Sequence, residues 1–250
     1  MNTCFNFEAS PFLENTTRLG VILPSVNTVV EPWYNTLLQE NESLHVTRMF
    51  LDKNVTPESL KEMDHVEGMH AAKCITSCKP EVIAYCCTAS SIVQGPEYDK
   101  NLKENLQRST GTECFTAVGA IVDALTKLKV KKISIASPYT DNIDHAEKIY
   151  FEHVGFNVLG TANFNISDSF LLAAPQAEQI IELSLNAWHP DSDALLISCL
   201  NMNSQFVAEI LEREIGRPVI TSTTATLWKL LRSAGITRPI SGFGRLLSSY

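Results

Sequence analysis

The chain has 250 residues, of which 44% are hydrophobic and 19% are charged, and its formal net charge is −8. No apolar run approaches the ~20 residues that a membrane-spanning helix needs, and the 20 basic residues form no basic face for nucleic acid. The length suffices for a buried core, so composition and charge favour a soluble globular protein without nucleic-acid or membrane partners.

Short apolar runs alternate along the chain with longer amphipathic segments. The apolar runs predict strands at Leu19–Leu23, Leu44–Phe50, Val82–Tyr85, Lys132–Ala136, Asn157–Ala162, Ala194–Ile197 and Pro218–Ile220. The amphipathic segments predict helices at Pro57–Ser77, Thr116–Lys127, Asn142–Glu152, Pro175–Trp188, Ser204–Ile215 and Ala225–Ser233. Alternating strands and helices, with strands apolar on both faces, are typical of a parallel sheet with crossover helices.

The segment before the first strand, residues 1–17, mixes polar, acidic and aromatic side chains. It lacks the basic start and apolar core of a signal peptide, so we interpret it as an N-terminal arm and expect a cytoplasmic protein. The seven cysteines are odd in number and belong to a chain that is not small. We therefore expect reduced thiols rather than a disulfide framework.

The order of elements repeats once within the chain. Leu19, in the first strand, and Cys87 are 68 residues apart, and Lys132 and Cys199 are 67 residues apart. Each half begins with a strand, passes through a second strand and reaches a third strand that ends at a cysteine. This echo favours two similar lobes that face each other, although a coincidence of spacing is the plainer alternative.

Small polar residues and thiols follow five of the predicted strands. These strand exits read Pro24-Ser25-Val26-Asn27-Thr28, Cys86-Cys87-Thr88-Ala89-Ser90, Ser137-Pro138-Tyr139-Thr140, Ser198-Cys199-Leu200-Asn201 and Thr221-Ser222-Thr223-Thr224. Ligands of parallel α/β sheets bind beyond the carboxyl ends of the strands. Helix N-termini at such exits direct backbone N–H groups at a bound anion. The pattern therefore predicts a site for a carboxylate or an enolate-like intermediate.

The two thiols at equivalent exits, Cys87 and Cys199, are the candidates for chemistry. A cysteine thiolate is a nucleophile or proton carrier, and a helix N-terminus favours the thiolate form. The alternative is that both only fill space, because free cysteine is among the most buried residue types. Cys86 precedes Cys87 on the strand and should point to the opposite face. We therefore assign Cys86 to packing.

Two other patterns bear on metals and cofactors. His70, Cys74 and Cys78 recur at four-residue steps and would share one helix face, but a zinc site needs further converging ligands that the sequence does not supply. The glycines form neither a GxGxxG nor a GxxxxGK[ST] motif. We therefore predict no metal and no nucleotide cofactor.

Six segments of the chain resemble a known family. They are LGVILPSVNTVVEP, VIAYCCTASSIVQG, ISIASPYTDNIDHAEKIYFEHVGFNVLG, PDSDALLISCLNMNS, GRPVITSTTATLWKLLR and GFGRLLSSY. From about Arg18 to Tyr250 the sequence resembles the aspartate/glutamate racemase superfamily. Within it, the chain resembles the branch of maleate cis-trans isomerases and arylmalonate decarboxylases.

The resemblance implies an α/β fold of two similar lobes. Each lobe would be a parallel sheet flanked by helices, and a pseudo-twofold axis would relate the lobes, with the active site in the cleft between them. Residues 18–112 and 222–250 would form lobe 1 with Cys87, residues 113–221 would form lobe 2 with Cys199, and residues 1–17 the arm.

The resemblance also implies roles for individual residues. Cys87 and Cys199 would be catalytic and would face each other across the substrate. The expected substrate-binding residues are Asn27, Ser25, Thr88, Tyr139, Ser169 and Leu200. Three positions depart from family patterns: Ser169 stands where the isomerases carry an asparagine, and Ala89 and Leu200 stand where the decarboxylases carry serine and glycine.

The implied function is a cofactor-independent isomerase of a small dicarboxylic acid, of the maleate-to-fumarate type, that forms a covalent adduct at Cys87. Decarboxylases of this branch keep only the second cysteine, so the presence of Cys87 favours an isomerase or racemase. The alternatives are a racemase, an arylmalonate-type decarboxylase, or a non-catalytic small-acid binding protein. The mixed faces of the helices also permit a homo-oligomer.

Overall fold

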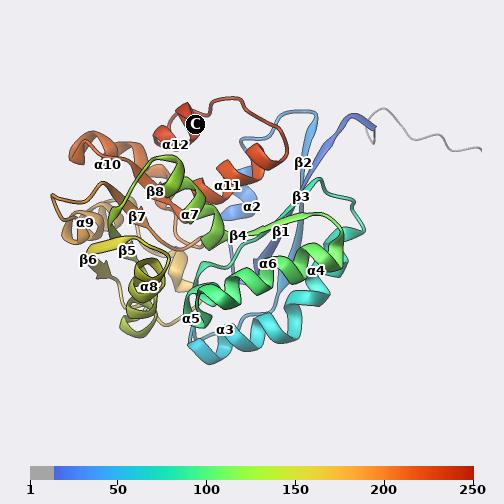
Figure 1. The fold of residues 1–250 in the computed structure, drawn as a ribbon, viewed down its shortest axis with the longest axis horizontal. Coiled ribbons are helices and arrows are strands. Elements are labelled where there is room, and N and C mark those ends of the chain that lie inside the picture. Colours follow the sequence, from blue (N-terminus) through green and yellow to red (C-terminus); the bar gives the residue numbers. More distant parts are fainter. Residues whose placement is uncertain (1–13) are drawn as a thin grey trace, which may run out of the picture.

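The computed structural model describes residues 14–250, whose strands form two four-stranded sheets (Figure 1). The first sheet has the order β2 (Glu42–Met49), β1 (Thr17–Pro24), β3 (Val82–Tyr85), β4 (Glu113–Thr116). The second has the order β6 (Asn157–Asn163), β5 (Lys132–Ser137), β7 (Ala194–Ile197), β8 (Val219–Thr221). All neighbouring strands are parallel, and the two orders are equivalent. The predicted fold of two similar lobes is confirmed.

Helices surround both sheets, as Figure 1 shows. In chain order they are α2 (Val30–Asn35), α3 (Pro57–Met63), α4 (Met69–Thr76), α5 (Thr88–Gln94), α6 (Pro96–Thr110), α7 (Ala117–Lys127), α8 (Asp141–His153), α9 (Ala177–Ala187), α10 (Ala208–Ile215), α11 (Ser222–Ser233) and α12 (Arg245–Ser249). A π-helical turn, Asp64–Gly68, joins α3 to α4, and short 3₁₀ turns lie at Leu171–Ala173 and Ser204–Phe206. No helix among residues 14–250 is both long and apolar enough to span a bilayer.

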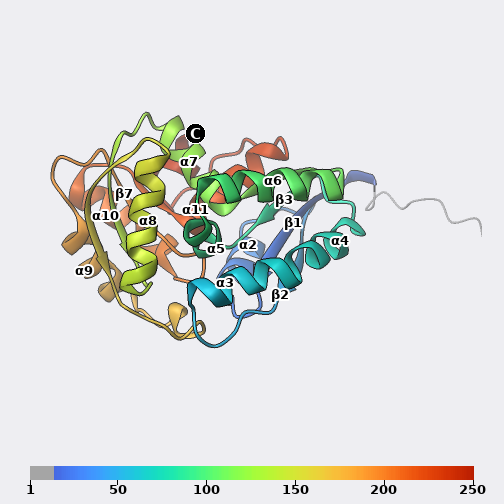
Figure 2. The same ribbon diagram turned by 60° about the horizontal axis from the view of Figure 1, so that its bottom comes forward.

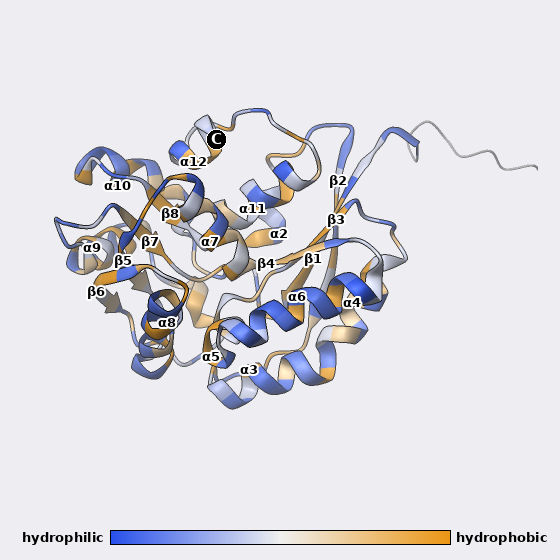
Figure 3. Cartoon of the chain, in the orientation of Figure 1, coloured by the Kyte–Doolittle hydropathy of each residue, from blue (hydrophilic) through white to orange (hydrophobic). Residues whose placement is uncertain are grey.

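The lobes share a core that the helices α7 and α11 form between the sheets. These two helices pack on each other, and both also contact strands, α11 on β3 and α7 on β4 and β8. A single cluster of buried apolar side chains continues from Leu19 in β1 to Ile220 in β8. Figure 3 shows the apolar strands inside and hydrophilic residues on the outer helices. This continuous core holds the two strand-exit edges at a fixed separation.

The division into lobes needs one correction. The predicted boundary between residues 112 and 113 separates β4 from the first sheet, but β4 pairs with β3 along its length. A boundary after Thr116 keeps that sheet whole. The predicted arm, residues 1–17, lies mostly outside the described residues, and its last residue, Thr17, already begins β1.

Strand register brings the predicted exits together. Ile22 of β1 pairs with Tyr85 of β3, so the loop after Pro24 lies beside the Cys86-Cys87 exit. In the second sheet Ala136 pairs with Ile197, which places the Tyr139 loop beside Cys199. Both strand pairs are central and buried. Because the paired strands are parallel, the two chain exits of each pair lie at the same edge of their sheet.

Candidate active site

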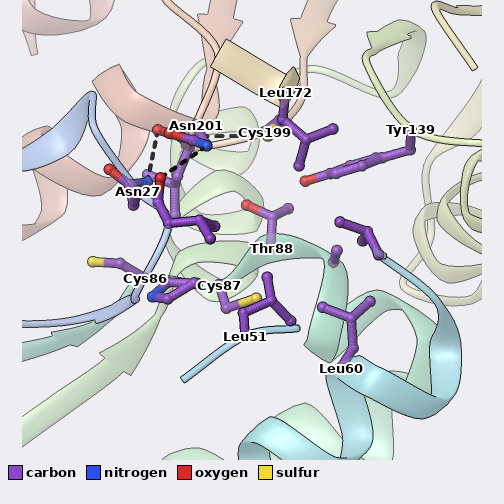
Figure 4. A pocket seen from close by; sticks show the side chains of 15 residues that line it. Asn27, Leu51, Leu60, Cys86, Cys87, Thr88, Tyr139, Leu172, Cys199 and Asn201 are labelled. Carbon is purple, nitrogen blue, oxygen red and sulfur yellow. Dashed lines mark hydrogen bonds between the residues drawn. The ribbon is translucent and has the colours of Figure 1, made fainter. Parts of the chain in front are cut away.

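A pocket with about 370 Å³ of empty space lies where the exits of the two sheets meet (Figure 4). Its lining residues come from both lobes: Pro24, Val26, Asn27, Leu51, Val55, Leu60, Cys86, Cys87, Thr88, Ala89, Tyr139, Leu172, Cys199, Leu200 and Asn201. Both predicted catalytic thiols and four of the six predicted substrate-binding residues are among them.

Cys87 marks the point where β3 passes into α5. Its backbone is extended and it is the N-cap residue of α5, so the strand ends and the helix begins at this residue. The preceding Cys86 has its side chain in the core between the sheets, whereas Cys87 belongs to the cluster beneath the pocket. Figure 4 shows the two sulfur atoms on opposite sides of the exit. The assignment of Cys86 to packing agrees with this geometry.

Cys199 has a strained backbone. Its φ of 103° lies in the region that residues with a side chain rarely adopt. The backbone N–H of Cys199 donates to Ser222 Oγ at 2.9 Å, and the N–H of Asn201 donates to the Cys199 Sγ at 3.3 Å. Such strain persists only where surrounding contacts determine it, and it concentrates at functional sites.

Two asparagines, Asn27 and Asn201, fasten the exits of the two lobes to each other. Asn27 Nδ2 donates to the Leu200 carbonyl at 3.1 Å, and its Oδ1 accepts from the N–H of Val30 at 2.9 Å. In return, Asn201 Oδ1 accepts from the N–H of Thr28 at 2.9 Å. The reciprocal bonds fix the distance across the pocket. Asn201 was missed as a candidate, although it stands in the quoted exit two residues after Cys199.

Thr88 and Tyr139 approach the pocket from the two lobes. Thr88 Oγ1 donates to Ser222 Oγ at 3.4 Å, the same oxygen that accepts from the N–H of Cys199. Tyr139 is buried, with its hydroxyl directed to the middle of the pocket. Ser222 thus links both thiol exits and is a second residue that the sequence did not single out.

The other two predicted residues, Ser25 and Ser169, are not among the lining residues. Ser25 Oγ accepts from the N–H of Leu51 at 3.1 Å and so holds the segment that carries Leu51 into the pocket. Ser169 lines an adjacent depression that shares Val26 and Leu51 with the pocket. Its carbonyl accepts from Asn201 Nδ2 at 3.3 Å. Ser25 and Ser169 therefore position the lining residues Leu51 and Asn201 through hydrogen bonds and do not line the pocket themselves.

Burial keeps both pocket thiols protonated at neutral pH. Burial and, to a smaller extent, the Asp64 carboxylate raise the pKa of Cys87, which Ser90 lowers, to about 12 in all. Burial also raises the pKa of Cys199 to about 12, while the nearby Tyr139 hydroxyl and the backbone N–H of Asn201 lower it. The sequence pattern led us to expect more acidic thiols. At these buried positions, loss of water outweighs the favourable effect of the neighbouring backbone N–H groups.

The polar side of the pocket consists of neutral groups. No Lys, Arg, His, Asp or Glu occurs among the residues that line it. A carboxylate there would meet the Tyr139 hydroxyl, the Thr88 hydroxyl and the backbone N–H groups of the first turn of α5, which have no acceptor within the helix. Such donors stabilise negative charge that develops during a reaction.

The opposite side of the pocket is apolar. Leu51 and Val55 come from the chain after β2, Leu60 from α3, and Leu172 from the 3₁₀ turn of the second lobe. No local sequence signal distinguishes these residues from ordinary core residues, so sequence reasoning missed them. Cys87 and Cys199 are buried beside these apolar side chains.

The helix-face pattern at His70 is a surface feature. Cys74 Sγ and His70 Nε2 lie 3.5 Å apart on α4, and Cys74 and Cys78 are exposed. In the described part of the chain no group of three or more His, Cys, Asp or Glu side chains could hold a metal ion. The six cysteines from Cys74 to Cys199 are free thiols, and Cys4 lies outside the described residues.

Two equivalent sheets thus contribute to one pocket, which has Cys87 and Cys199 in its lining and no charged side chain. Residues 19–247 match the family model described as arylmalonate decarboxylase. The chain therefore belongs to that family, and the predicted superfamily and branch are confirmed.

The chain is also similar to individual relatives and solved structures. A maleate isomerase of Geobacillus stearothermophilus is 28% identical over 245 residues, covering 92% of this chain and 97% of the relative. A maleate isomerase of Pseudomonas putida solved with maleate has a TM-score of 0.87 at 26% identity, covering 93% and 98% of the two chains. A mutant of the Nocardia farcinica maleate cis-trans isomerase, solved with a covalently bound succinylcysteine intermediate, has a TM-score of 0.88 at 26% identity, covering 94% and 99%. These findings support the prediction of an isomerase.

Proposed function

We propose that this protein converts maleate, or a close cis-dicarboxylate, to the trans isomer through a covalent adduct at Cys87. The observation that carries the proposal is the placement of Cys87 and Cys199 in one pocket, one from each lobe. The similarity to maleate isomerases over nearly the whole chain, one of them solved with a succinylcysteine intermediate, supports the same reaction.

The reaction begins when the Cys87 thiol releases its proton to water and the thiolate sulfur adds to one alkene carbon. The electrons of the double bond move towards the carboxylate on the other alkene carbon and give an enolate-like species, which the Tyr139 and Thr88 hydroxyls stabilise. The bond between the two carbons is now single and rotates. Cys199 delivers a proton to the carbanionic carbon and later recovers it. Expulsion of the Cys87 thiolate then restores the double bond in the trans geometry.

The pocket argues against the other reactions that the sequence left open. An amino-acid racemase needs a partner for the substrate ammonium group, and the lining residues include no carboxylate. Decarboxylation requires one proton donor, which leaves no role for the second thiol. Both cysteines have a role in isomerisation.

Proton NMR of maleate incubated with the reduced protein in D₂O tests the proposal. We expect fumarate with the wild type and none with Cys87→Ala or Cys199→Ala. Cys114→Ala is the matched control, because Cys114 is a buried thiol in β4 outside the pocket. Unchanged maleate with the wild type would refute the proposed reaction, and full activity of Cys87→Ala would refute the covalent adduct.

A further inference from the structure

The hydroxyl of Ser222 lies between the two strand exits that carry the pocket thiols. Ser222 is the first residue of α11 and has no exposed surface. Its Oγ accepts from the backbone N–H of Cys199 at 2.9 Å and, at the longer distance of 3.4 Å, from Thr88 Oγ1. Ser222 is not among the residues that line the pocket. It therefore contacts residues of the site from outside the space that a substrate would occupy.

The helix α11 brings this hydroxyl to the boundary between the lobes. The helix directly follows β8 of the second sheet and packs on β3 of the first sheet, the strand that leads to Cys87 (Figure 2). Its N-terminus is capped by Thr221 and Thr224, each of whose hydroxyls accepts from the backbone N–H of the other. Because this cap does not use the Ser222 side chain, the Ser222 hydroxyl is available to Cys199.

The bond from Cys199 to Ser222 takes the place of a bond between two parallel strands. In the pair of β7 and β8, the N–H of Leu195 donates to the carbonyl of Pro218, and these residues are 23 apart in the chain, as Cys199 and Ser222 are. At Ser222, however, β8 has ended and α11 has begun. The backbone carbonyl of a helical residue accepts from the N–H four residues further on. The side-chain oxygen of Ser222 therefore accepts where the carbonyl of a longer β8 would.

This bond holds Cys199 in its unusual backbone conformation. A φ of 103° is costly for a residue with a side chain and persists only where surrounding contacts determine it. On one side, the N–H of Ser198 still donates to the Ala136 carbonyl of β5 at 2.8 Å. On the other side, the N–H of Asn201 donates to the Cys199 Sγ at 3.3 Å. Between these two contacts, Ser222 fixes the backbone N–H of Cys199 and with it the direction of the thiol.

We propose that Ser222 is a positioning residue for proton transfer by Cys199, because its hydroxyl fixes the backbone that directs the thiol at the substrate. The inference rests on the proposed function for the step that Cys199 performs. In that reaction the protonated adduct on Cys87 becomes product only after Cys199 has recovered the proton that it delivered. A displaced Cys199 thiol slows this recovery and leaves the addition at Cys87 intact. Loss of the Ser222 hydroxyl therefore has the consequence of a weakened Cys199.

Ser222→Ala removes the acceptor and retains the cap of α11, which Thr221 provides. Thr226→Val is the matched control. Thr226 lies on the same helix, is equally buried, and its hydroxyl has no hydrogen-bond partner among the described residues. Valine keeps the shape of threonine, so the control removes a buried hydroxyl that the site does not use. Circular dichroism sets equal amounts of folded protein for the comparison.

The first readout is the turnover of maleate, with samples quenched in acid for intact mass and peptide mapping. We expect Ser222→Ala to lower kcat by about 10²-fold, the effect of a displacement of about 1 Å at a reacting group, with a smaller change in KM. The fraction of protein that carries a succinyl group on Cys87 should exceed the wild-type fraction. Thr226→Val should match the wild type in all three quantities. A variant that was only less stable would lose activity without accumulating the adduct.

The second readout needs no turnover. In protein labelled with ¹⁵N and ¹³C at cysteine only, the Cys199 signals are assigned by their absence from the spectrum of Cys199→Ala. We expect Ser222→Ala to speed exchange of the Cys199 amide proton with D₂O by about tenfold, the factor that one lost buried hydrogen bond corresponds to. The Cys199 Cα shift, which reports φ, should also move. The signals of Cys114, which lies outside the pocket, should not change.

Two results would overturn the inference. One is wild-type exchange and a wild-type Cα shift at Cys199 in Ser222→Ala, which would mean that other contacts hold the backbone. The other is a changed Cys199 backbone together with wild-type kcat and adduct fraction, which would separate the Ser222 contact from the reaction. If the wild type leaves maleate unchanged, the proposed function fails, and the NMR comparison still decides whether Ser222 fixes Cys199.

Discussion

Glu147 offers a test of how burial controls charge beside the second thiol. It lies on α8 with no exposed surface, and neither carboxyl oxygen makes a well-formed hydrogen bond. Burial raises the pKa of Glu147 from its ordinary 4.5 to about 8, while the adjacent Ser198 hydroxyl lowers it and Asp144 raises it. The neighbouring elements α5 and β6 carry no charged residue that would compensate. Glu147 should therefore be a neutral acid at pH 7.

Because the pKa of Glu147 is raised in the folded protein, its titration lowers the free energy of unfolding as pH rises. Below about pH 4.5 the carboxyl is protonated in both the folded and the unfolded state, so its titration does not change the free energy of unfolding. As pH rises towards 8, the unfolded chain releases its proton and the folded protein retains it, so the free energy of unfolding falls. The two pKa values of 4.5 and about 8 correspond to a loss of roughly 5 kcal/mol above pH 8, and of about 3 kcal/mol at pH 7.

Replacing Glu147 with Met should remove this loss, because methionine has a similar length and no charge to bury. Urea unfolding of the wild type and Glu147→Met at about pH 5, 7 and 9 measures it. We expect the variant to gain stability relative to the wild type as pH rises, by several kcal/mol across that range. Glu152→Met, at a partly exposed position of the same helix, should show no such gain. Equal pH dependence of wild type and Glu147→Met would refute the reasoning.

Three further predictions concern packing, capping and chemistry. Gly160→Ala should destabilise the protein by about 1–3 kcal/mol in urea, because its Cβ would lie 2.3 Å from the Ala187 carbonyl oxygen; unchanged stability would contradict this. Thr221→Ala should lose the capping box of α11 and about 1 kcal/mol by the same measurement. Tyr139→Phe should lower kcat about 10²-fold with a smaller change in KM, since it removes a hydroxyl that stabilises the intermediate; a change in KM alone would assign Tyr139 to substrate binding.

The sequence predicted the buried strands well, and missed elements whose side chains carry little periodic signal. Val82–Tyr85 and Ala194–Ile197 are strands with the predicted bounds. Each consists of four consecutive buried apolar residues, a pattern that strongly favours a buried strand. The four-residue strand β4 was missed because only its neighbours in the sheet make it a strand. The helix α6 was missed because it is mostly polar and buries only Asp99, Leu102 and Leu106.

The residues of the candidate site also fall into those that the sequence predicted and those that it did not. Cys87, Cys199 and Thr88 stand at strand exits, and parallel topology alone brings exits to one edge. Leu60 and Leu172 reach the pocket from elements far away in the sequence, so no local pattern indicates them. Single-sequence reasoning also could not foresee that both thiols would be so fully buried, because burial depends on the closure of the two lobes.

The most direct test of the central claim is to trap the adduct on Cys87. Cys199→Ser keeps the nucleophile and weakens the group that returns the proton, so incubation with maleate should add the mass of one maleate to the protein. Peptide mapping should place the added mass on Cys87 as a succinyl thioether. An unmodified protein, or an adduct on the exposed Cys74 or Cys78 and none on Cys87, would contradict the covalent mechanism.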